Sequence, residues 1–313
     1  MVNWVAVSSP LSGEPPRADD PVLVIGNFDG VHRGHVELLR LARAAEPGAP
    51  TVVVTFWPHP MSVIRPDQAP PLLTSLDRRV ELLEAAGADR VEIVDFTPDV
   101  AGWSPEQFVD RVLRPLHPRL VVVGENFRFG FRAGGNVDTL AKLGVGDFEV
   151  QAVPLVTDGI QPSSSTLIRH AVLEGDLGRV RELSGQTFRF SGVVVHGDQR
   201  GRELGFPTAN VSVPPGMAVP ADGVYAGWVT RLDVPSPRWP AAISVGSNPT
   251  FDGLERRVEA YVLDRTDLEL YGVPIAVDFY ARLRGQVKYA GLGPLIEQIR
   301  QDVEQVRHLL QSS

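Results

Sequence analysis

The stretch VLVIGNFDGVHRGH, residues 22–35, decides the fold of the first half of the chain. Its opening run, VLVI, is apolar and β-branched like a buried strand, and a helical pattern begins near its end. The glycines between the two suit a tight turn. His32 and His35 are three residues apart, so on a helix they share one face, at the end whose free N–H groups favour an anion. The stretch predicts a strand, a turn and a helix whose first turn binds phosphate.

Two other interpretations of His32 and His35 stay open. A strand-to-helix turn explains the glycines and would leave the polar residues as solvated caps. The histidines could also bind a metal beside Asp29, although the chain has no cysteine and shows no clear third and fourth ligand. Two familiar phosphate motifs are excluded. The Gly-Lys dipeptide of the Walker A pattern is absent, and the glycines are not spaced as in a dinucleotide-binding fingerprint.

The rest of the first half repeats this alternation of strand and helix. Short β-rich runs lie between amphipathic helical patterns: TVVVTF (51–56), RVEIVDF (90–96), RLVVVG (119–124) and FEVQAVPL (148–155). The alternation predicts an α/β domain with a doubly wound, Rossmann-like parallel sheet that helices cover on both faces. Ligands of such sheets bind beyond the carboxyl ends of the strands, which is where residues 26–35 lie.

The second half has a different pattern. After residue 186, short strands are separated by Gly/Pro turns, and a helical period returns only in LIEQIRQDVEQVRHLL near the end. This pattern predicts a small antiparallel β-barrel or sandwich closed by a C-terminal helix. We place the boundary near Gly185, which gives domains at residues 1–184 and 187–313.

Composition limits the function classes. The 313 residues suggest roughly two domains. The absence of cysteine excludes disulfides and thiolate chemistry and fits a reducing compartment. A net charge of −8 argues against a nucleic-acid partner. No apolar run is long enough to span a membrane, and the N-terminal residues lack the pattern of a signal peptide. We therefore expect a cytoplasmic protein without a membrane or nucleic-acid partner, and the sequence does not predict its oligomeric state.

Four motifs of the first half occur in a family-specific order: GNFDGVHRGH (26–35), TFWPHP (55–60), GENFRFG (124–130) and SSSTLIR (163–169). The first resembles the signature of the nucleotidyltransferase superfamily, whose first histidine pair contacts ATP phosphates. The full set resembles the adenylyltransferase half of bacterial bifunctional riboflavin kinase/FAD synthetases. The resemblance extends over nearly the whole chain from residue 21 and implies that this half joins FMN to the AMP part of ATP.

The resemblance also implies roles for individual residues. Adenylyl transfer needs alignment and charge neutralisation rather than a covalent nucleophile. The implied catalytic residues are His32, His35 and Arg169. The implied ATP or phosphate contacts are Gly26, Phe28, Asp29, Gly34, Ser164, Ser165 and Thr166. The implied flavin contacts are His59, Asn126, Phe127 and Phe129, although either phenylalanine could equally be a core residue. By itself, SSSTLIR would be a serine N-cap followed by a surface arginine, and it departs from the family pattern at Ser163 and Leu167.

The second half carries its own motif, HGDQRGRELGFPTAN, residues 196–210. It resembles the riboflavin kinase signature, in which a glycine-bearing loop, here with Gly201 and Gly205, covers ATP and the PTAN segment supplies the metal contact. Thr208 and Asn210 offer hard oxygen ligands suited to Mg²⁺. The simpler interpretation is a hairpin with Gly/Pro turns, which does not explain why both residues follow the proline.

Glu259 is the candidate general base of the second half. It lies in the β-rich run VEAYVLD and matches the catalytic glutamate of the family. A weakly nucleophilic alcohol benefits from such a base. By position alone, Glu259 would be a solvated strand residue. The segment also departs from the family at Ser244, which is usually asparagine, and at Tyr289, which is usually phenylalanine.

The expected function is therefore two-step flavin synthesis with ATP, riboflavin and FMN as substrates and Mg²⁺ in both steps. The C-terminal domain would convert riboflavin to FMN, and the N-terminal domain would convert FMN to FAD. Three alternatives stay open. One activity could be lost, the substrate could be another phosphorylated compound, or the chain could be a flavin-binding protein without turnover.

Overall fold

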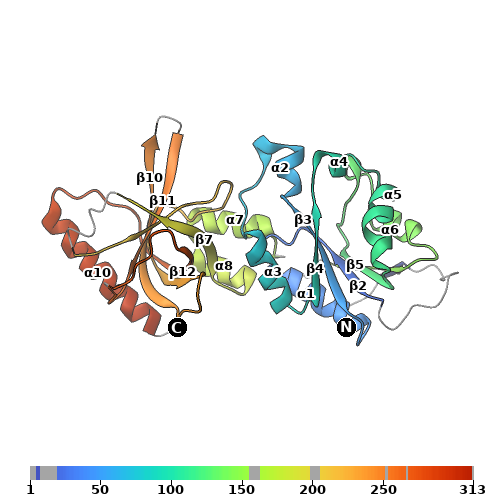
Figure 1. The fold of residues 1–313 in the computed structure, drawn as a ribbon, viewed down its shortest axis with the longest axis horizontal. Coiled ribbons are helices and arrows are strands. Elements are labelled where there is room, and N and C mark those ends of the chain that lie inside the picture. The colour runs from blue at the N-terminus through green and yellow to red at the C-terminus, as the bar shows by residue number, and fades with distance from the viewer. Residues whose placement is uncertain are drawn as a thin grey trace. The chain divides into compact units, whose positions relative to one another are not determined.

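A computed structural model describes residues 5–7, 20–154, 163–197, 205–250, 253–265 and 267–311. They form two compact units (Figure 1). The first consists of Met1–Pro70 and Leu76–Ser164, and the second consists of Pro71–Ser75 and Ser165–Ser313. None of the described helices is both long and apolar enough to cross a membrane.

The first unit is built on a six-stranded sheet in the order β1-β6-β5-β2-β3-β4. Five strands are parallel: β2 (Val22–Ile25), β3 (Thr51–Trp57), β4 (Arg90–Asp95), β5 (Leu120–Gly124) and β6 (Glu149–Val153). This confirms the predicted parallel sheet. The sixth strand, β1 (Val5–Val7), pairs antiparallel with β6 and was not predicted, because its short run carries no distinctive pattern.

Helices cover both faces of this sheet, as predicted. On one face, Val22 and Val24 share a core with α1 (Arg33–Ala45) and α3 (Leu76–Ala85). On the other, Leu23 and Ile25 share a core with α5 (Pro105–Phe108), the π-turn η2 (Val109–Leu113) and α6 (Val137–Leu143). The shorter elements are α2 (Pro60–Ile64), η1 (Pro66–Gln68), α4 (Pro98–Ala101), η3 (Arg114–Leu116) and η4 (Phe131–Ala133).

The strand order creates a topological switch point beside β2. From β2 the chain continues to β3 on one side, whereas β5 lies against β2 on the other side. The loops that leave the carboxyl ends of β2 and β5 therefore diverge at one edge of the sheet, which is the usual place for a ligand. These loops are residues 26–32 and 125–130.

The second unit contains a closed antiparallel barrel in the order β10-β11-β8-β7-β12-β9. The strands are β7 (Phe188–Val195), β8 (Ala209–Val211), β9 (Gly223–Arg231), β10 (Trp239–Thr250), β11 (Gly253–Val262) and β12 (Pro274–Arg284). The helix α10 (Leu292–Gln311) packs outside the barrel, where Val303 and Val306 join a cluster with Ala226 and Leu263. Of the two predicted architectures, the structure has the barrel.

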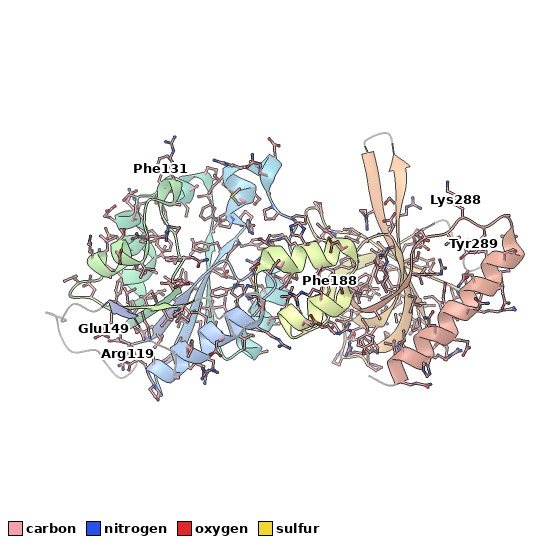
Figure 2. All side chains as sticks on the ribbon, turned by 180° about the vertical axis from the view of Figure 1, so that it is seen from behind. Arg119, Phe131, Glu149, Phe188, Lys288 and Tyr289 are labelled. Carbon is pink, nitrogen blue, oxygen red and sulfur yellow. The ribbon has the colours of Figure 1, made fainter. Side chains whose placement is uncertain are left out.

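Two helices, α7 (Ser165–Glu174) and α8 (Leu177–Ser184), belong to the second unit. Their apolar side chains, including Val172 and Leu183, share one core with Phe188, which is labelled in Figure 2. The compact units thus divide at Ser164, whereas the sequence places the boundary near Gly185. An amphipathic helix reveals which of its faces is buried but not which domain buries it.

A short segment from the first half of the sequence also belongs to the second unit. Leu72 forms a bridge with Met217, because its N–H donates to Gly216 O at 2.7 Å and its carbonyl accepts from Ala218 N at 2.8 Å. Leu73 is 2% exposed and lies in the core of the second unit. Pro71–Ser75 is therefore a structural part of this unit.

Replacing Leu73 with alanine should destabilise the second unit by about 2–5 kcal/mol, because the change leaves a cavity in its core. Hydrogen exchange at the amides of β7 and β12 under increasing urea would measure the stability of this unit separately. The matched control is Leu292→Ala, since Leu292 is 64% exposed. Equal protection in the two variants would contradict the assignment of Leu73 to this core.

Candidate active sites

The turn after β2 is held in a strained conformation. Phe28 has φ of 50°, Gly30 of 86° and Val31 of 34°, all in the left-handed region. Positive φ is unfavourable for a β-branched residue such as Val31. The side chains of Phe28 and Val31 are only 1% and 2% exposed and pack into the core beside α1. Packing of these two side chains therefore fixes the turn.

Contacts within the turn leave little room for side chains at two of its glycines. A Cβ on Gly26 would lie 2.9 Å from the ring of Phe28, and one on Gly34 would lie 3.2 Å from the ring of His32. Gly30 is needed for its positive φ. The sequence interpretation assigned the glycines to close approach of phosphates. The packing of Phe28 gives Gly26 a second role, and the expected phosphate contacts of Gly26 and Gly34 stay predictions.

His32 and His35 lie together at the start of α1. Their rings stack with centroids 3.6 Å apart and planes 19° apart. The backbone N–H of His32 donates to Nδ1 of His35 at 3.3 Å. A neutral histidine that accepts at Nδ1 carries its proton on Nε2, so His35 has a donor at its other nitrogen. Nδ1 of His32 is buried and has no hydrogen-bond partner among the described residues.

Both histidines are neutral at pH 7 in the free chain. Burial lowers the pKa of His32 to about 4, although the nearby Asp29 opposes the shift. Burial also holds the pKa of His35 well below its ordinary value, and the charges of His32 and Arg79 add to this effect. The expected role of the two histidines at ATP phosphates stays a prediction. Before a ligand binds, they offer N–H donors rather than positive charges.

A buried ion pair lies beside this turn. Nη2 of Arg79, on α3, is 3.4 Å from Oδ1 of Asp29, and the two side chains are 0% and 1% exposed. Nη1 of Arg79 also donates to the carbonyl of Phe56, at the end of β3, at 3.2 Å. Sequence reasoning missed Arg79 because it treated the helix only as amphipathic. The available signal was an arginine four residues before the buried Leu83, on the apolar face.

His59 and Asn126 follow the carboxyl ends of β3 and β5, the two parallel strands on either side of β2. His59 is buried and caps α2, where its Nδ1 accepts from the N–H of Met61 at 3.1 Å. Asn126 is exposed and follows β5. Because β3 and β5 flank β2, both residues leave the same edge of the sheet as the histidine turn.

Phe127 and Phe129 occupy different environments. Their rings stack with centroids 5.4 Å apart. Phe129 is 7% exposed and packs against Phe108 in the core. The structure therefore favours the core interpretation for Phe129 over stacking on a flavin. Phe127 is half-buried at the margin of the same core, so its expected flavin contact stays a prediction.

The motif SSSTLIR is divided between the two units. Ser163 and Ser164 end the first unit, and the carbonyl of Ser163 approaches Gly34 at the start of α1, 3.7 Å from where a Cβ would lie. Ser165 begins α7, as the motif predicted, and Thr166 and Arg169 follow on this helix. Nε of Arg169 donates to the carbonyl of Pro71 at 2.7 Å.

In the second unit, three of the predicted residues come together on the barrel. Glu259 on β11 lies directly opposite Asn210 on β8, and Oγ1 of Thr208 donates to Oε2 of Glu259 at 3.3 Å. The neighbours of Glu259 in sequence, Val258 and Ala260, are buried in the barrel core. Because side chains alternate along a strand, Glu259 and Asn210 lie on the outer face of the barrel.

Sequence reasoning missed Gln286, which ties a neighbouring segment to this site. Its Nε2 donates to Oγ of Ser244 at 3.0 Å and to the carbonyl of Val245 at 2.9 Å. Ser244 is the cross-strand neighbour of Glu259 on β10. The segment between β12 and α10, which carries Lys288 and Tyr289 (Figure 2), is thereby fixed beside Glu259. Only the barrel register reveals this contact.

The chain after β7 passes close to Asn210. A Cβ on Gly197 would lie 2.3 Å from Nδ2 of Asn210, so a side chain here would displace the Asn210 amide. Gly205 is exposed and has φ of 85°, in open space. Gly201, the other glycine of the expected ATP-covering loop, lies outside the described residues.

A cavity of about 830 Å³ lies beside Asn210 within the second unit. Its wall comes from the end of β7, from β8 and the residues that follow it, and from β11; it includes Val195, Gly197, Ser212, Met217, Arg256 and Arg257. This volume falls in the range of small-molecule and cofactor sites. The cavity is therefore a candidate site for a nucleotide.

The oxygen atoms near Glu259 fit a magnesium ion better than a transition metal. The hydroxyl of Thr208, the amide oxygen of Asn210 and the carboxylate of Glu259 are hard ligands, and Mg²⁺ commonly binds through few protein oxygens together with water and phosphate. No cluster of three or more His, Cys, Asp or Glu residues that could hold a metal occurs among the residues that the structure describes.

Comparisons with known proteins agree with this division into two sites. The family model of FAD synthetase matches residues 14–167, and that of riboflavin kinase matches residues 184–310. The bifunctional riboflavin kinase/FMN adenylyltransferase of Listeria monocytogenes is 37% identical over 292 residues, covering 91% of each chain. The protein of the same name from Pseudomonas fluorescens is 37% identical over 294 residues, covering 92% of each chain.

A solved structure is similar over the same extent. The crystal structure of a Streptococcus pneumoniae protein, described as a macrolide-efflux protein, matches with a TM-score of 0.82 and 31% identity. The match covers 94% of this chain and 96% of that one. The fold described above is therefore shared along nearly the whole length of both chains.

The buried neutral state of His32 should make the first unit acid-sensitive. Between pH 6.5 and about 4, the unfolded chain binds a proton at His32 that the folded chain does not, so stability falls as the pH falls. A shift of this size corresponds to about 3 kcal/mol at the acid end of the window. Over this pH interval, the free energy of unfolding of His32→Gln should therefore fall by about 3 kcal/mol less than that of the parent chain.

Urea denaturation at pH 7, 5.5 and 4, followed by hydrogen exchange in β2 and β5, would measure this difference. His117→Asn is the matched control, because His117 is exposed and asparagine tolerates its left-handed φ of 48°. If the free energy of unfolding falls equally with pH in His32→Gln and in the parent chain, His32 is not the responsible group.

Proposed function

The chain belongs to the family of bifunctional riboflavin kinases/FMN adenylyltransferases, and on this premise we propose how its two units divide and perform the synthesis of FAD. The second unit phosphorylates riboflavin to FMN, and the first unit converts FMN and ATP to FAD and pyrophosphate. The observation that carries the proposal is the convergence of Thr208, Asn210 and Glu259 on the barrel, since the PTAN segment and the glutamate are far apart in sequence.

In the kinase step, Glu259 is the proposed general base. It accepts the proton of the terminal ribityl hydroxyl as that oxygen attacks the γ-phosphorus of ATP, and the bond to the β-phosphate oxygen breaks to release ADP. Mg²⁺ held by Thr208 and Asn210 would withdraw negative charge from the phosphates. The cavity beside Asn210 would hold the nucleotide. The contacts of Gly201 and Gly205 with ATP stay expectations from the motif.

In the adenylyl-transfer step, the chain supplies alignment and hydrogen-bond donors. A phosphate oxygen of FMN attacks the α-phosphorus of ATP, and the bond from this phosphorus to the bridging oxygen of pyrophosphate breaks. The Nε2–H of His35 and the free N–H groups at the start of α1 donate to the phosphate oxygens as their charge develops. His32 lies against His35 and takes part in the same contact.

The remaining assignments concern binding. His59, Asn126 and Phe127 would contact the flavin or nucleotide at the carboxyl edge of the sheet. Ser164, Ser165 and Thr166 would contact ATP phosphates. A phosphate contact from Arg169 would use its terminal nitrogens, because its Nε donates to the carbonyl of Pro71. We place the enzyme in the cytoplasm because a chain without cysteine suits a reducing compartment.

Glu259→Gln should reduce the conversion of riboflavin to FMN by about 10²–10⁴-fold, because the amide cannot accept the proton. The formation of FAD from supplied FMN should stay unchanged. The assay incubates the protein with riboflavin, ATP and Mg²⁺ and follows FMN and FAD separately over time. Glu297→Gln, an exposed change on α10, is the matched control. Kinase turnover within tenfold of the parent chain would be incompatible with a general-base role.

His35→Ala should produce the opposite pattern in the same assay. FMN should accumulate at the normal rate, and its conversion to FAD should slow by about 10²–10³-fold, as expected for the loss of a donor to developing charge. In the parent chain, FMN should rise first and then convert to FAD. FMN that accumulates in the parent chain without FAD would refute adenylyl transfer, and the absence of both products would favour a flavin-binding protein without turnover.

A further inference from the structure

Arg79 is a fully buried cation beside the histidine turn, and the mechanism above does not use it. Its guanidinium contacts Asp29 through Nη2 and the carbonyl of Phe56 through Nη1. It also lies 5.4 Å from the ring centroid of Trp57. Arg79 thus connects α3 and the end of β3 to the turn that follows β2.

The ion pair lies in the middle of the turn. Asp29 lies between Phe28 and Gly30, both with positive φ. A buried ion pair seldom adds stability over apolar residues of the same volume, because both charges must leave water. Stability alone is therefore a weak reason for a buried arginine at this place, whereas holding a carboxylate at a defined point beside His32 and His35 is a specific one.

The stacked histidines can accept only one proton between them. With the ring centroids 3.6 Å apart, two positive charges would repel strongly in a buried site. Among the described residues, Asp29 from the turn acts on His32, and both Arg79 from α3 and His32 act on His35. Asp29 favours a positive charge on His32, whereas Arg79 disfavours one on His35.

The hydrogen bond at the start of α1 also favours protonation of His32 over protonation of His35. Nδ1 of His35 accepts from the backbone N–H of His32 at 3.3 Å, and a protonated His35 would have to give up this acceptor. Nδ1 of His32 has no such bond in the described structure, so His32 has no acceptor contact to give up. Geometry and charge thus distinguish two residues that the sequence motif leaves equivalent.

We propose that Arg79 is a positioning residue for adenylyl transfer: by holding Asp29 beside the turn, it directs the single proton that the pair can accept to His32 and keeps His35 a neutral Nε2–H donor. This inference rests on the adenylyl transfer proposed for the first unit. The proton arrives when the triphosphate of ATP adds negative charge near the pair, and it returns to solvent when pyrophosphate leaves.

The first test needs only the parent chain. Histidine nitrogen NMR reports the protonation state and tautomer of each ring, and α,β-methylene-ATP with Mg²⁺ is a nucleotide that cannot transfer its adenylyl group. On binding, His32 should become protonated and His35 should stay neutral with its proton on Nε2. A complex in which His35 is the protonated ring, or in which neither ring changes, would overturn the proposal.

The second test changes the ion pair. Arg79→Met alone leaves a buried carboxylate unpaired and can prevent folding. The double variant Asp29→Asn with Arg79→Met removes both charges together. It should lower kcat for FAD formation from supplied FMN by about 100-fold, the loss expected from misplaced groups, with KM for ATP changed much less. In the NMR experiment, the nucleotide complex of the double variant should no longer show preferential protonation of His32 over His35.

Arg78→Met is the matched control, because Arg78 is the neighbouring arginine on α3 and pairs with Glu81 at 2.9 Å nearer the surface. Kinase turnover of the same chains reports whether the second unit remains intact. An unchanged kcat together with unchanged histidine protonation in the double variant would refute the role of Arg79. Failure of the parent chain to form FAD from FMN would instead refute the proposed adenylyl transfer itself.

Discussion

The first unit depends on the burial of Phe28 and Val31 in the turn after β2. Both residues have positive φ, and their packing into the core compensates for the strain. The ring of Phe28 lies where a side chain at position 26 would be. The packing of Phe28 therefore depends on glycine at this position. The first turn of α1 is therefore fixed before a ligand arrives, as preorganised donors for developing charge require.

In the barrel, strand register positions the residues of the candidate site. Val258 and Ala260 are buried inside, so Glu259 must lie outside, and pairing with β8 places it opposite Asn210. A shift of one residue in β11 would turn Glu259 into the core and remove the site. Pairing of β11 with β10 brings Ser244 to the other side of Glu259. There Gln286 donates a hydrogen bond to Ser244.

Several basic side chains of the candidate sites are neutral or already bound within the protein. Both histidines are neutral, Arg79 is paired with Asp29, and Nε of Arg169 binds a backbone carbonyl. The sites offer hydroxyls, amides, neutral N–H groups and a helix start.

The sequence by itself determined the kinds of local structure and the motifs. The period of the apolar residues predicted the parallel sheet covered on both faces, the antiparallel second half and its terminal helix, because a buried face follows from periodicity alone. The motifs predicted Thr208, Asn210 and Glu259 together, and the spacing of His32 and His35 placed them on one face of a helix.

Only the tertiary structure decided which elements pack together and how the site groups are charged. Periodicity does not identify the partner of a buried face, so the sequence could not assign α7, α8 and Pro71–Ser75 to the barrel unit. It also placed Phe129 equally well in a flavin site or in the core. The pairing of Arg79 with Asp29 joins residues fifty positions apart, and the neutral state of His32 and His35 follows from their burial. Both are properties of the folded chain, because burial and charge proximity arise only when distant segments meet.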